Sequence, residues 1–119
     1  MTIKKEMYVN RNGLTWYHKP TTDLPNPDKV KLCEDWLKEF IDKRKTINKD
    51  AYSYRLKHVV ERYSKSYIAN GEFIQAAINL GYNIEPEGNL NASFNMSMKR
   101  WNKFVRETQD ENDKQQNIV

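Results

Sequence analysis

The chain has 119 residues, the length of one ordinary domain, and 38% of them are hydrophobic, which is enough for one modest core. No apolar run approaches the roughly 18 residues of a membrane span, and the first ten residues are too polar for a signal peptide. We therefore expect a cytoplasmic protein with no membrane partner. The single cysteine, Cys33, excludes an internal disulfide, and with only two histidines a closed four-ligand zinc site is not expected.

Positive charge is concentrated in the body of the chain. Twenty Lys and Arg against sixteen Asp and Glu give a formal net charge of +4. Residues 1–106 hold nineteen of the basic and twelve of the acidic residues, a net of +7, whereas residues 107–119 hold one Lys and four acids, a net of −3. Because residues 107–119 also contain few apolar side chains, we expect them to form an acidic disordered tail. The basic body favours a polyanionic partner.

The first predicted elements are a hairpin and a helix. Residues 1–20 form an N-terminal segment in which two short β-favouring runs flank Asn12-Gly13, a pattern typical of a β-hairpin. A loop with two prolines follows. Pro27 suits the first position of a helix, and apolar residues recur at helical spacing after it until near Lys45.

Two further helices, a second hairpin and a last helix are predicted next. The second helix runs from about Asp50 to about Ser64. A short third helix has Asn70 as its cap, opens with Gly71 and Glu72, and stops at Gly81. After Gly81 apolar and polar residues alternate on both sides of a turn-forming stretch, which predicts a β-hairpin. Ser97 then suits the cap of a last helix.

This order of elements is typical of a winged helix-turn-helix. We therefore expect a single domain that is mainly α with a small β-hairpin, its winged-helix-like body spanning residues 27–106. In such a fold the second helix of the pair enters the major groove of DNA. Glu72, Gln75, Ala76 and Asn79 would face the groove. The two amides can pair with adenine, but Glu72 would repel phosphate. The same helix carries no Lys or Arg, however, so the alternative that the helix pair is core scaffold stays open.

The last predicted helix carries the densest positive charge of the chain. Four Lys and Arg lie within eight residues with no acid among them, and three of the four share one helical face. Such a stripe suits contacts with the phosphates of nucleic acid, DNA in the first place. The alternative is the solvated outer face of a surface helix. With cations of the second helix and the two amides above, the candidate nucleic-acid-binding residues are Arg55, Lys57, His58, Gln75, Asn79, Lys99, Arg100, Lys103 and Arg106.

Aromatic residues form another candidate surface in the N-terminal segment. Tyr8, Trp16 and Tyr17 lie among basic residues, a combination that suits stacking with bases of single-stranded nucleic acid. The same rings equally suit packing over the helices as the lid of a small core. A third alternative is an interface with a protein, where Trp and Tyr are favoured. We take these three rings as candidate partner-binding residues.

No pattern of catalytic residues is found in the sequence. Cys33 lies on the apolar stripe of the first predicted helix and is expected to be a buried, inert thiol. The carboxylates are scattered among lysines, and the four glycines are spaced as turn and cap residues, so neither a metal cluster nor a phosphate-binding loop is predicted. We therefore expect no catalytic residues, metal, cofactor or small-molecule substrate, and at most an accessory subunit of an enzyme.

Residues 53–97 resemble a motif of small proteins carried by phages, plasmids and other bacterial mobile elements. The motif reads Ser-Tyr-x-Leu-Lys-His, then Tyr-Ile-x-Asn-Gly-x-Phe-Ile-x-Ala-Ala, then Asn-x-x-Phe-Asn-x-Ser, and covers about 45 of the 119 residues. Its signature positions here are Ser53, Tyr54, Lys57, His58, Tyr67, Asn70, Gly71, Phe73, Asn91, Phe94 and Asn95. Size, charge and element type also resemble those of the small accessory protein of the staphylococcal cassette chromosome polymerase-primase.

The resemblance and the charge together imply a function without catalysis. We expect an accessory protein of a bacterial mobile genetic element that binds nucleic acid, a replication enzyme such as a polymerase, or both. The alternative is a phage-encoded inhibitor that binds a host nucleic-acid enzyme, as anti-CRISPR proteins do. The two differ in salt dependence, because a nucleic-acid binder loses affinity steeply as salt rises.

Overall fold

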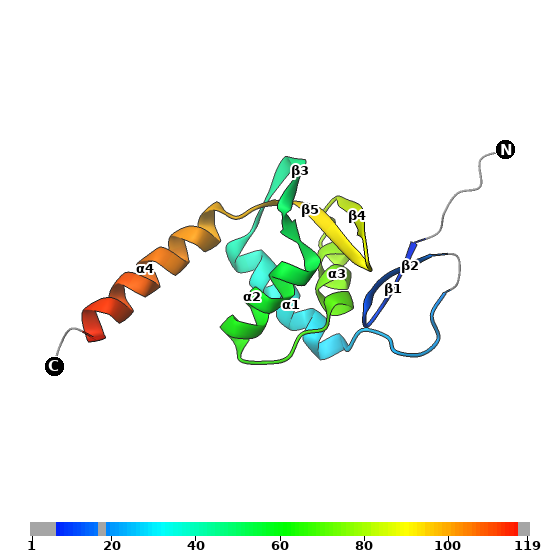
Figure 1. Ribbon diagram of the computed structural model, residues 1–119, viewed down its shortest axis with the longest axis horizontal. Helices are drawn as coiled ribbons and strands as arrows, with labels where there is room; N and C mark the ends of the chain where they lie inside the picture. Colours follow the sequence, from blue (N-terminus) through cyan, green and yellow to red (C-terminus); the bar gives the residue numbers. More distant parts are fainter. Residues whose placement is uncertain (1–6, 17–18, 117–119) are drawn as a thin grey trace.

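The computed structural model describes residues 7–16 and 19–116, which form four helices and two antiparallel sheets (Figure 1). Tyr17, a candidate partner-binding residue, lies outside the described residues. The elements in chain order are β1 (Met7–Asn10), β2 (Gly13–Trp16), α1 (Pro27–Phe40), β3 (Asp42–Tyr52), α2 (Ser53–Ser64), α3 (Asn70–Asn79), β4 (Ile84–Gly88), β5 (Asn91–Ser97) and α4 (Lys99–Gln116).

The expectation of a mainly α, winged-helix-like domain with a small hairpin is wrong. Of the described residues, 54 lie in helices and 31 in strands, and the sheets are β1-β2 and a three-stranded sheet in the order β3-β5-β4. The domain is therefore α/β. The element missing from the sequence prediction is β3, because α1 ends at Phe40 instead of near Lys45, and α2 begins at Ser53 instead of near Asp50. Only Ala51 of β3 is buried, so no apolar alternation marks this strand.

The N-terminal hairpin predicted around Asn12-Gly13 is confirmed. Asn10 pairs with Gly13, so the turn residues are Arg11 and Asn12, one position earlier than the Asn-Gly pair suggests. The side-chain oxygen of Asn10 accepts hydrogen bonds from the backbone N–H groups of Asn12 and Gly13, at 2.8 and 3.0 Å. An asparagine that binds the backbone two residues ahead stabilises a tight turn.

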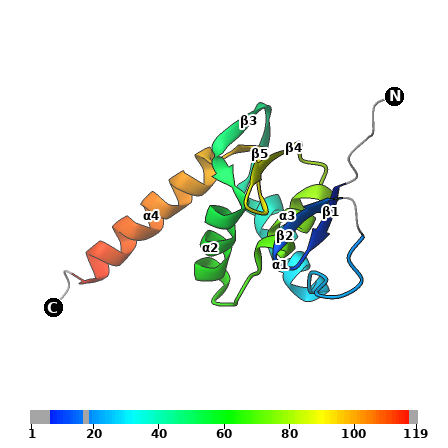
Figure 2. The ribbon, with the colours of Figure 1, turned by 45° about the vertical axis from the view of Figure 1, so that its right-hand side comes forward.

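This hairpin lies against the start of α3 and the β4–β5 turn (Figure 2). The N–H of Gly71 donates to the carbonyl of Arg11 at 2.9 Å, and the N–H of Leu14 donates to the carbonyl of Leu90 at 3.0 Å. The two backbones approach so closely that a Cβ on Gly71 would lie 1.6 Å from the carbonyl oxygen of Asn10. Glycine at position 71 therefore permits the hairpin to dock.

Helix α3 is the central helix of the domain. It contacts α1, α2, β5 and both strands of the N-terminal hairpin. Its buried residues are Asn70, Gly71, Glu72, Phe73, Ile74, Ala76 and Ala77. The prediction that Glu72 and Ala76 face a DNA groove is therefore wrong, because both point into the core. A helix that is covered on most sides belongs to the core and does not present a free face to a partner.

Asn95 ties the three-stranded sheet together from a buried position. Its Nδ2 donates to the carbonyl of Arg44 in β3 at 2.9 Å, and its Oδ1 accepts from the N–H of Asn83, just before β4, at 2.7 Å. The side chain therefore replaces backbone pairing where the register between β3 and β5 shifts.

Replacing Asn95 by alanine should lower the free energy of unfolding by about 2 kcal/mol, because two partly buried backbone groups lose their partner. Urea denaturation followed by circular dichroism measures the loss. Asn102→Ala, at an exposed position of α4, is the control and should change the free energy by less than about 0.5 kcal/mol. Equal effects of the two substitutions would contradict the role given to Asn95.

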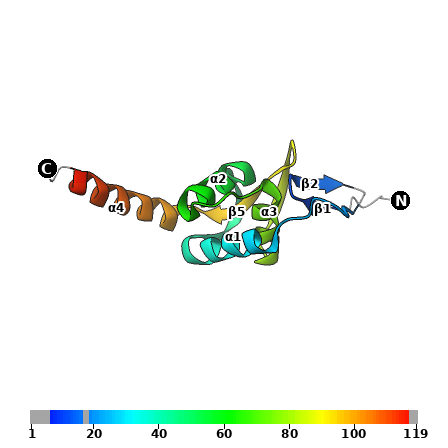
Figure 3. The same ribbon diagram turned by 90° about the horizontal axis from the view of Figure 1, so that it is seen from below.

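Helix α4 extends away from the body of the domain, which we define as α1 to β5 (Figures 1 and 3). Its first turns are held by Trp101 and Phe104, whose ring centroids lie 4.9 and 4.8 Å from that of Phe40 and 5.7 and 6.0 Å from that of Tyr63. The helix continues to Gln116, into the segment for which the sequence predicts a disordered tail. None of the helices in the described residues is long and apolar enough to cross a membrane.

Candidate functional site

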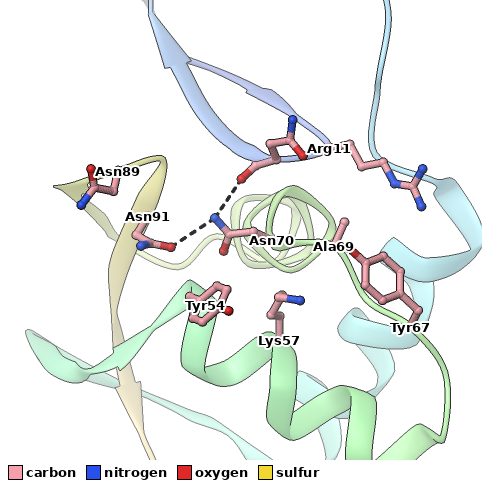
Figure 4. A pocket seen from close by; sticks show the side chains of 9 residues that line it. Arg11, Tyr54, Lys57, Tyr67, Ala69, Asn70, Asn89 and Asn91 are labelled. Atoms are coloured by element: carbon pink, nitrogen blue, oxygen red, sulfur yellow. Dashed lines mark hydrogen bonds between the residues drawn. The ribbon is translucent and has the colours of Figure 1, made fainter.

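A cleft of about 500 Å³ opens where four segments of the chain meet (Figure 4). The segments are the β1–β2 turn, the first turn of α2, the α2–α3 loop with the start of α3, and the β4–β5 turn. We call this site the polar cleft. Its lining residues are Arg11, Asn12, Tyr54, Lys57, Tyr67, Ala69, Asn70, Asn89 and Asn91. Five of them are signature positions of the motif in residues 53–97, so folding brings the motif residues together.

Lys57 lies within the polar cleft and is only 7% exposed. Its ammonium group donates to Oε1 of Glu61 and to the carbonyl of Ile68, both at 3.1 Å. The same nitrogen lies 5.4 Å from the ring centroid of Tyr54 and 5.1 Å from that of Tyr67. The sequence places Lys57 among exposed phosphate contacts, whereas the structure gives it a buried position between two rings, where cation–π attraction holds it.

Glu61 fixes the positions of Lys57 and its neighbour His58. Oε1 of Glu61 accepts from Lys57 and from the N–H of Ile68 at 3.1 Å, and Oε2 lies 2.9 Å from Nδ1 of His58. Burial alone would raise the pKa of Glu61, but the hydrogen bonds from Ile68, Lys57 and His58 outweigh it and hold the pKa below its ordinary value. The carboxylate is thus kept charged, which keeps Lys57 in place.

Two half-exposed tyrosine rings border the polar cleft. Tyr54 is 52% exposed and Tyr67 is 59% exposed, although both carry a cation at one face. The ring of His58 meets that of Tyr54 edge-on at 4.6 Å, and the guanidinium of Arg11 lies 5.9 Å from the centroid of Tyr67. Exposed rings beside cations suit a ligand that is both planar and negatively charged.

A second depression, of about 470 Å³, lies between α2 and α4, and we call it the basic groove. Its lining residues are Arg55, Val59, Arg62, Tyr63, Trp101, Asn102 and Val105. Lys99 and Arg106 flank Asn102 on the surface of α4, because residues three and four positions apart are neighbours on a helix. Arg62, Lys99 and Arg106 have no acidic partner among the side chains that the structure describes.

The predicted cations of α4 divide into two groups. Lys103 is largely exposed and lies 4.0 Å from Glu107, a separation at which solvent screens the pair. Arg100 instead faces the body, where its side chain donates to Oδ2 of Asp42 at 3.0 Å and to the carbonyl of Glu39 at 2.7 Å. Arg100 thus anchors α4, and the exposed stripe consists of Lys99, Lys103 and Arg106.

The two amides predicted to read DNA bind one another. Nε2 of Gln75 donates to Oδ1 of Asn79 at 2.8 Å, and Nδ2 of Asn79 donates to Glu34 on α1 at 2.9 Å. They lie near neither the polar cleft nor the basic groove, since they line a separate depression with residues of α1 and the loop before it. The predicted partner-binding rings Tyr8 and Trp16 are half-buried on the N-terminal hairpin.

Cys33 is fully buried, as its place on the apolar stripe predicts. Burial, followed by the charges of Glu72 and Glu34, raises the pKa of the thiol to about 12, so it stays protonated at neutral pH. Among the described residues, no group of three or more His, Cys, Asp or Glu side chains is placed to hold a metal ion.

The sequence indicates Arg11 only as one of the basic residues around the N-terminal rings, and it does not indicate Asn12 or Asn89 as members of a site. Docking of the N-terminal hairpin beside α3 brings Arg11 and Asn12 to the polar cleft, and the β4–β5 turn brings Asn89. Comparison with protein-family models, curated proteins and solved structures finds no match to this chain. The site is therefore interpreted from its own geometry.

Proposed function

We propose that this protein is a non-catalytic accessory protein that binds nucleic acid, with the phosphates of the strand lying along the basic groove. The observation that carries the proposal is the position of cations from two helices at one groove. Arg55 and Arg62 of α2 line it, Lys99 and Arg106 flank its lining residue Asn102 on α4, and Arg62, Lys99 and Arg106 pair with none of the described acidic side chains. Cations that are free of acidic partners bind phosphates without first breaking an ion pair, and each contact releases counterions from the nucleic acid.

The groove also carries rings that suit a strand rather than a small anion. Tyr63 is 44% exposed there, and Trp101 is half-buried beside it. Rings next to cations bind bases and backbone together. The resemblance of residues 53–97 to small proteins of mobile elements supports a setting in DNA replication, with a polymerase or another replication enzyme as the protein partner.

The salt dependence of binding tests this proposal. A fluorescently labelled 20-nucleotide DNA strand is titrated with protein at 50 to 200 mM KCl, and binding is followed by anisotropy. About four phosphate contacts to a single strand would weaken binding roughly 50-fold over this range. The variant Lys99→Ala/Arg106→Ala removes two of them, so the slope of log affinity against log salt should fall in magnitude by about 1.4.

The matched control is Lys19→Ala/Lys31→Ala, which removes the same charge from exposed positions near the N-terminal hairpin. It should change affinity less than about twofold if long-range attraction is screened. Equal losses of DNA affinity in the two double variants would show that net charge, and not the basic groove, determines binding. If the protein bound neither single-stranded nor duplex DNA, the proposed function would be wrong.

A further inference from the structure

Asn70, the first residue of α3, lies at the centre of the polar cleft. Asn70 is 8% exposed, and its Nδ2 lies 3.1 Å from the carbonyl of Asn12, 3.2 Å from that of Leu90 and 3.2 Å from Oδ1 of Asn91. Backbone carbonyls only accept hydrogen bonds, so the two carbonyls fix which end of the amide carries the nitrogen.

The other end of this amide has no partner. Oδ1 of Asn70 is buried and makes no hydrogen bond within the described residues. Figure 4 shows the amide at the centre of the polar cleft, with Tyr54 and Lys57 on one side and Tyr67 and Arg11 on another. Buried polar atoms of native proteins are almost always paired, so an unpaired acceptor on a residue that lines a cleft calls for a ligand with an N–H or O–H donor.

We infer that the polar cleft holds one unpaired nucleobase of the bound strand, which donates an N–H to Oδ1 of Asn70 and stacks on the exposed ring of Tyr54 or Tyr67. The inference rests on the proposed function, because it needs a bound strand. Helix α2 contributes Tyr54 and Lys57 to the cleft and Arg55 and Arg62 to the groove, so a strand that crosses α2 would reach both depressions. A nucleotide combines the three features that the cleft complements, which are a planar ring, a donor on its edge and a negative phosphate.

Two cations at the polar cleft, Lys57 and Arg11, complement the acceptor groups of a nucleotide. Lys57 uses two of its three N–H groups on Glu61 and Ile68, so one remains for an acceptor on the edge of the base. Arg11 is 53% exposed and lies on the outer side of Tyr67, where it can bind the phosphate of the same nucleotide. The cleft volume of about 500 Å³ is that of an ordinary small-ligand site.

The inference favours cytosine over thymine in this position. The two bases have the same ring size and charge, but cytosine carries an amino donor where thymine carries a carbonyl acceptor. In this register the amino group of cytosine pairs with Oδ1 of Asn70, and the adjacent ring nitrogen accepts from Lys57. Thymine reverses both groups, since it presents a carbonyl to Oδ1 and its ring N–H to the ammonium of Lys57, so both contacts are lost.

Fluorescence anisotropy at 50 mM KCl tests this preference for cytosine with three labelled strands of equal length. The strands are oligo-dC, oligo-dT, and an oligo-dC in which each amino group carries two methyl groups and therefore has no donor. We expect oligo-dC to bind about tenfold more tightly than the other two. Because the donor is removed from the ligand, this comparison uses the wild-type protein and does not depend on the folding of a variant.

Two variants complete the test. Asn70→Ala should abolish the preference for oligo-dC, and Tyr54→Ala/Tyr67→Ala should weaken binding of all three strands about tenfold or more. Tyr52→Ala, a partly exposed ring outside the cleft, is the control and should leave affinity unchanged. Equal binding of the three strands with the salt slope intact would overturn this inference and leave the proposed function standing, whereas failure of every strand to bind would overturn both.

Discussion

Replacing Gly71 by alanine should destabilise the protein by about 3 kcal/mol, although alanine is the better helix former. Gly71 lies in the first turn of α3, where helix propensity alone would make alanine stabilising by up to about 1 kcal/mol. The added Cβ would lie 1.6 Å from the carbonyl oxygen of Asn10, however, and that atom belongs to backbone that cannot move without undocking the hairpin. A lower free energy of unfolding would show that the clash with Asn10 prevails, and a higher one would show that helix propensity prevails.

The control for this prediction is Gly88→Ala. Gly88 has a φ of +77° and no atom within 4 Å of an added Cβ, so alanine there suffers only the backbone penalty of about 1–2 kcal/mol. Urea denaturation followed by circular dichroism compares the two variants. A Gly71→Ala protein as stable as the wild type would show that the hairpin does not dock on α3 as described.

Replacing Glu72 by alanine should lower the free energy of unfolding by about 4 kcal/mol. Glu72 is fully buried, and its two oxygens accept from the N–H groups of Ala69 and Asn26 at 2.8 and 2.9 Å. Nε of Arg11 lies 3.8 Å from Oε2. One carboxylate thus joins the start of α3, the loop before α1 and the N-terminal hairpin, and alanine leaves all three without their acceptor.

Glu72→Gln separates shape from charge. Glutamine has the same size and keeps one acceptor oxygen, but its NH₂ group faces a backbone N–H, so we expect a loss of about 2 kcal/mol. Glu39→Ala, at an exposed position of α1, should cost less than about 0.5 kcal/mol. Thermal denaturation of the three variants tests this order, and a Glu72→Ala protein that melts with the Glu39→Ala protein would contradict it.

The helices and hairpins of this protein leave clear patterns in the sequence, and β3 does not. Helix α3 is predictable because Phe73, Ile74 and Ala77 recur at helical spacing, and all three are buried. The helix begins at Asn70, one residue before the start that the sequence indicates, and Ala69 takes the cap position. Strand β3 is held by β5 and by side chains such as Asn95, interactions with residues that lie far along the chain. A local pattern contains no signal for such pairing.

The basic groove and the polar cleft also differ in how far each can be predicted from local sequence patterns. The cations of α4 are contiguous in the sequence, so their exposed stripe is predictable from helical spacing, except that Arg100 is drawn to Asp42 by a tertiary contact. The polar cleft is assembled from four separate segments. Each asparagine and glycine in them, judged by its own sequence neighbours, has the pattern of a turn or cap residue. The one local hint is Gly71, since glycine in the first turn of a helix indicates a close approach of another backbone.

The position of the N-terminal hairpin has a thermodynamic consequence. Because Arg11 and Asn12 form one wall of the polar cleft, a molecule bound there touches the hairpin as well as α2 and α3. Only the docked form offers the complete wall, so occupancy and docking belong to one linked equilibrium. A ligand at 100 times its dissociation constant would stabilise the docked form by about 2.7 kcal/mol more. The ratio of docked to undocked molecules would then rise about a hundredfold. The position of the first two strands would then report whether the polar cleft is occupied.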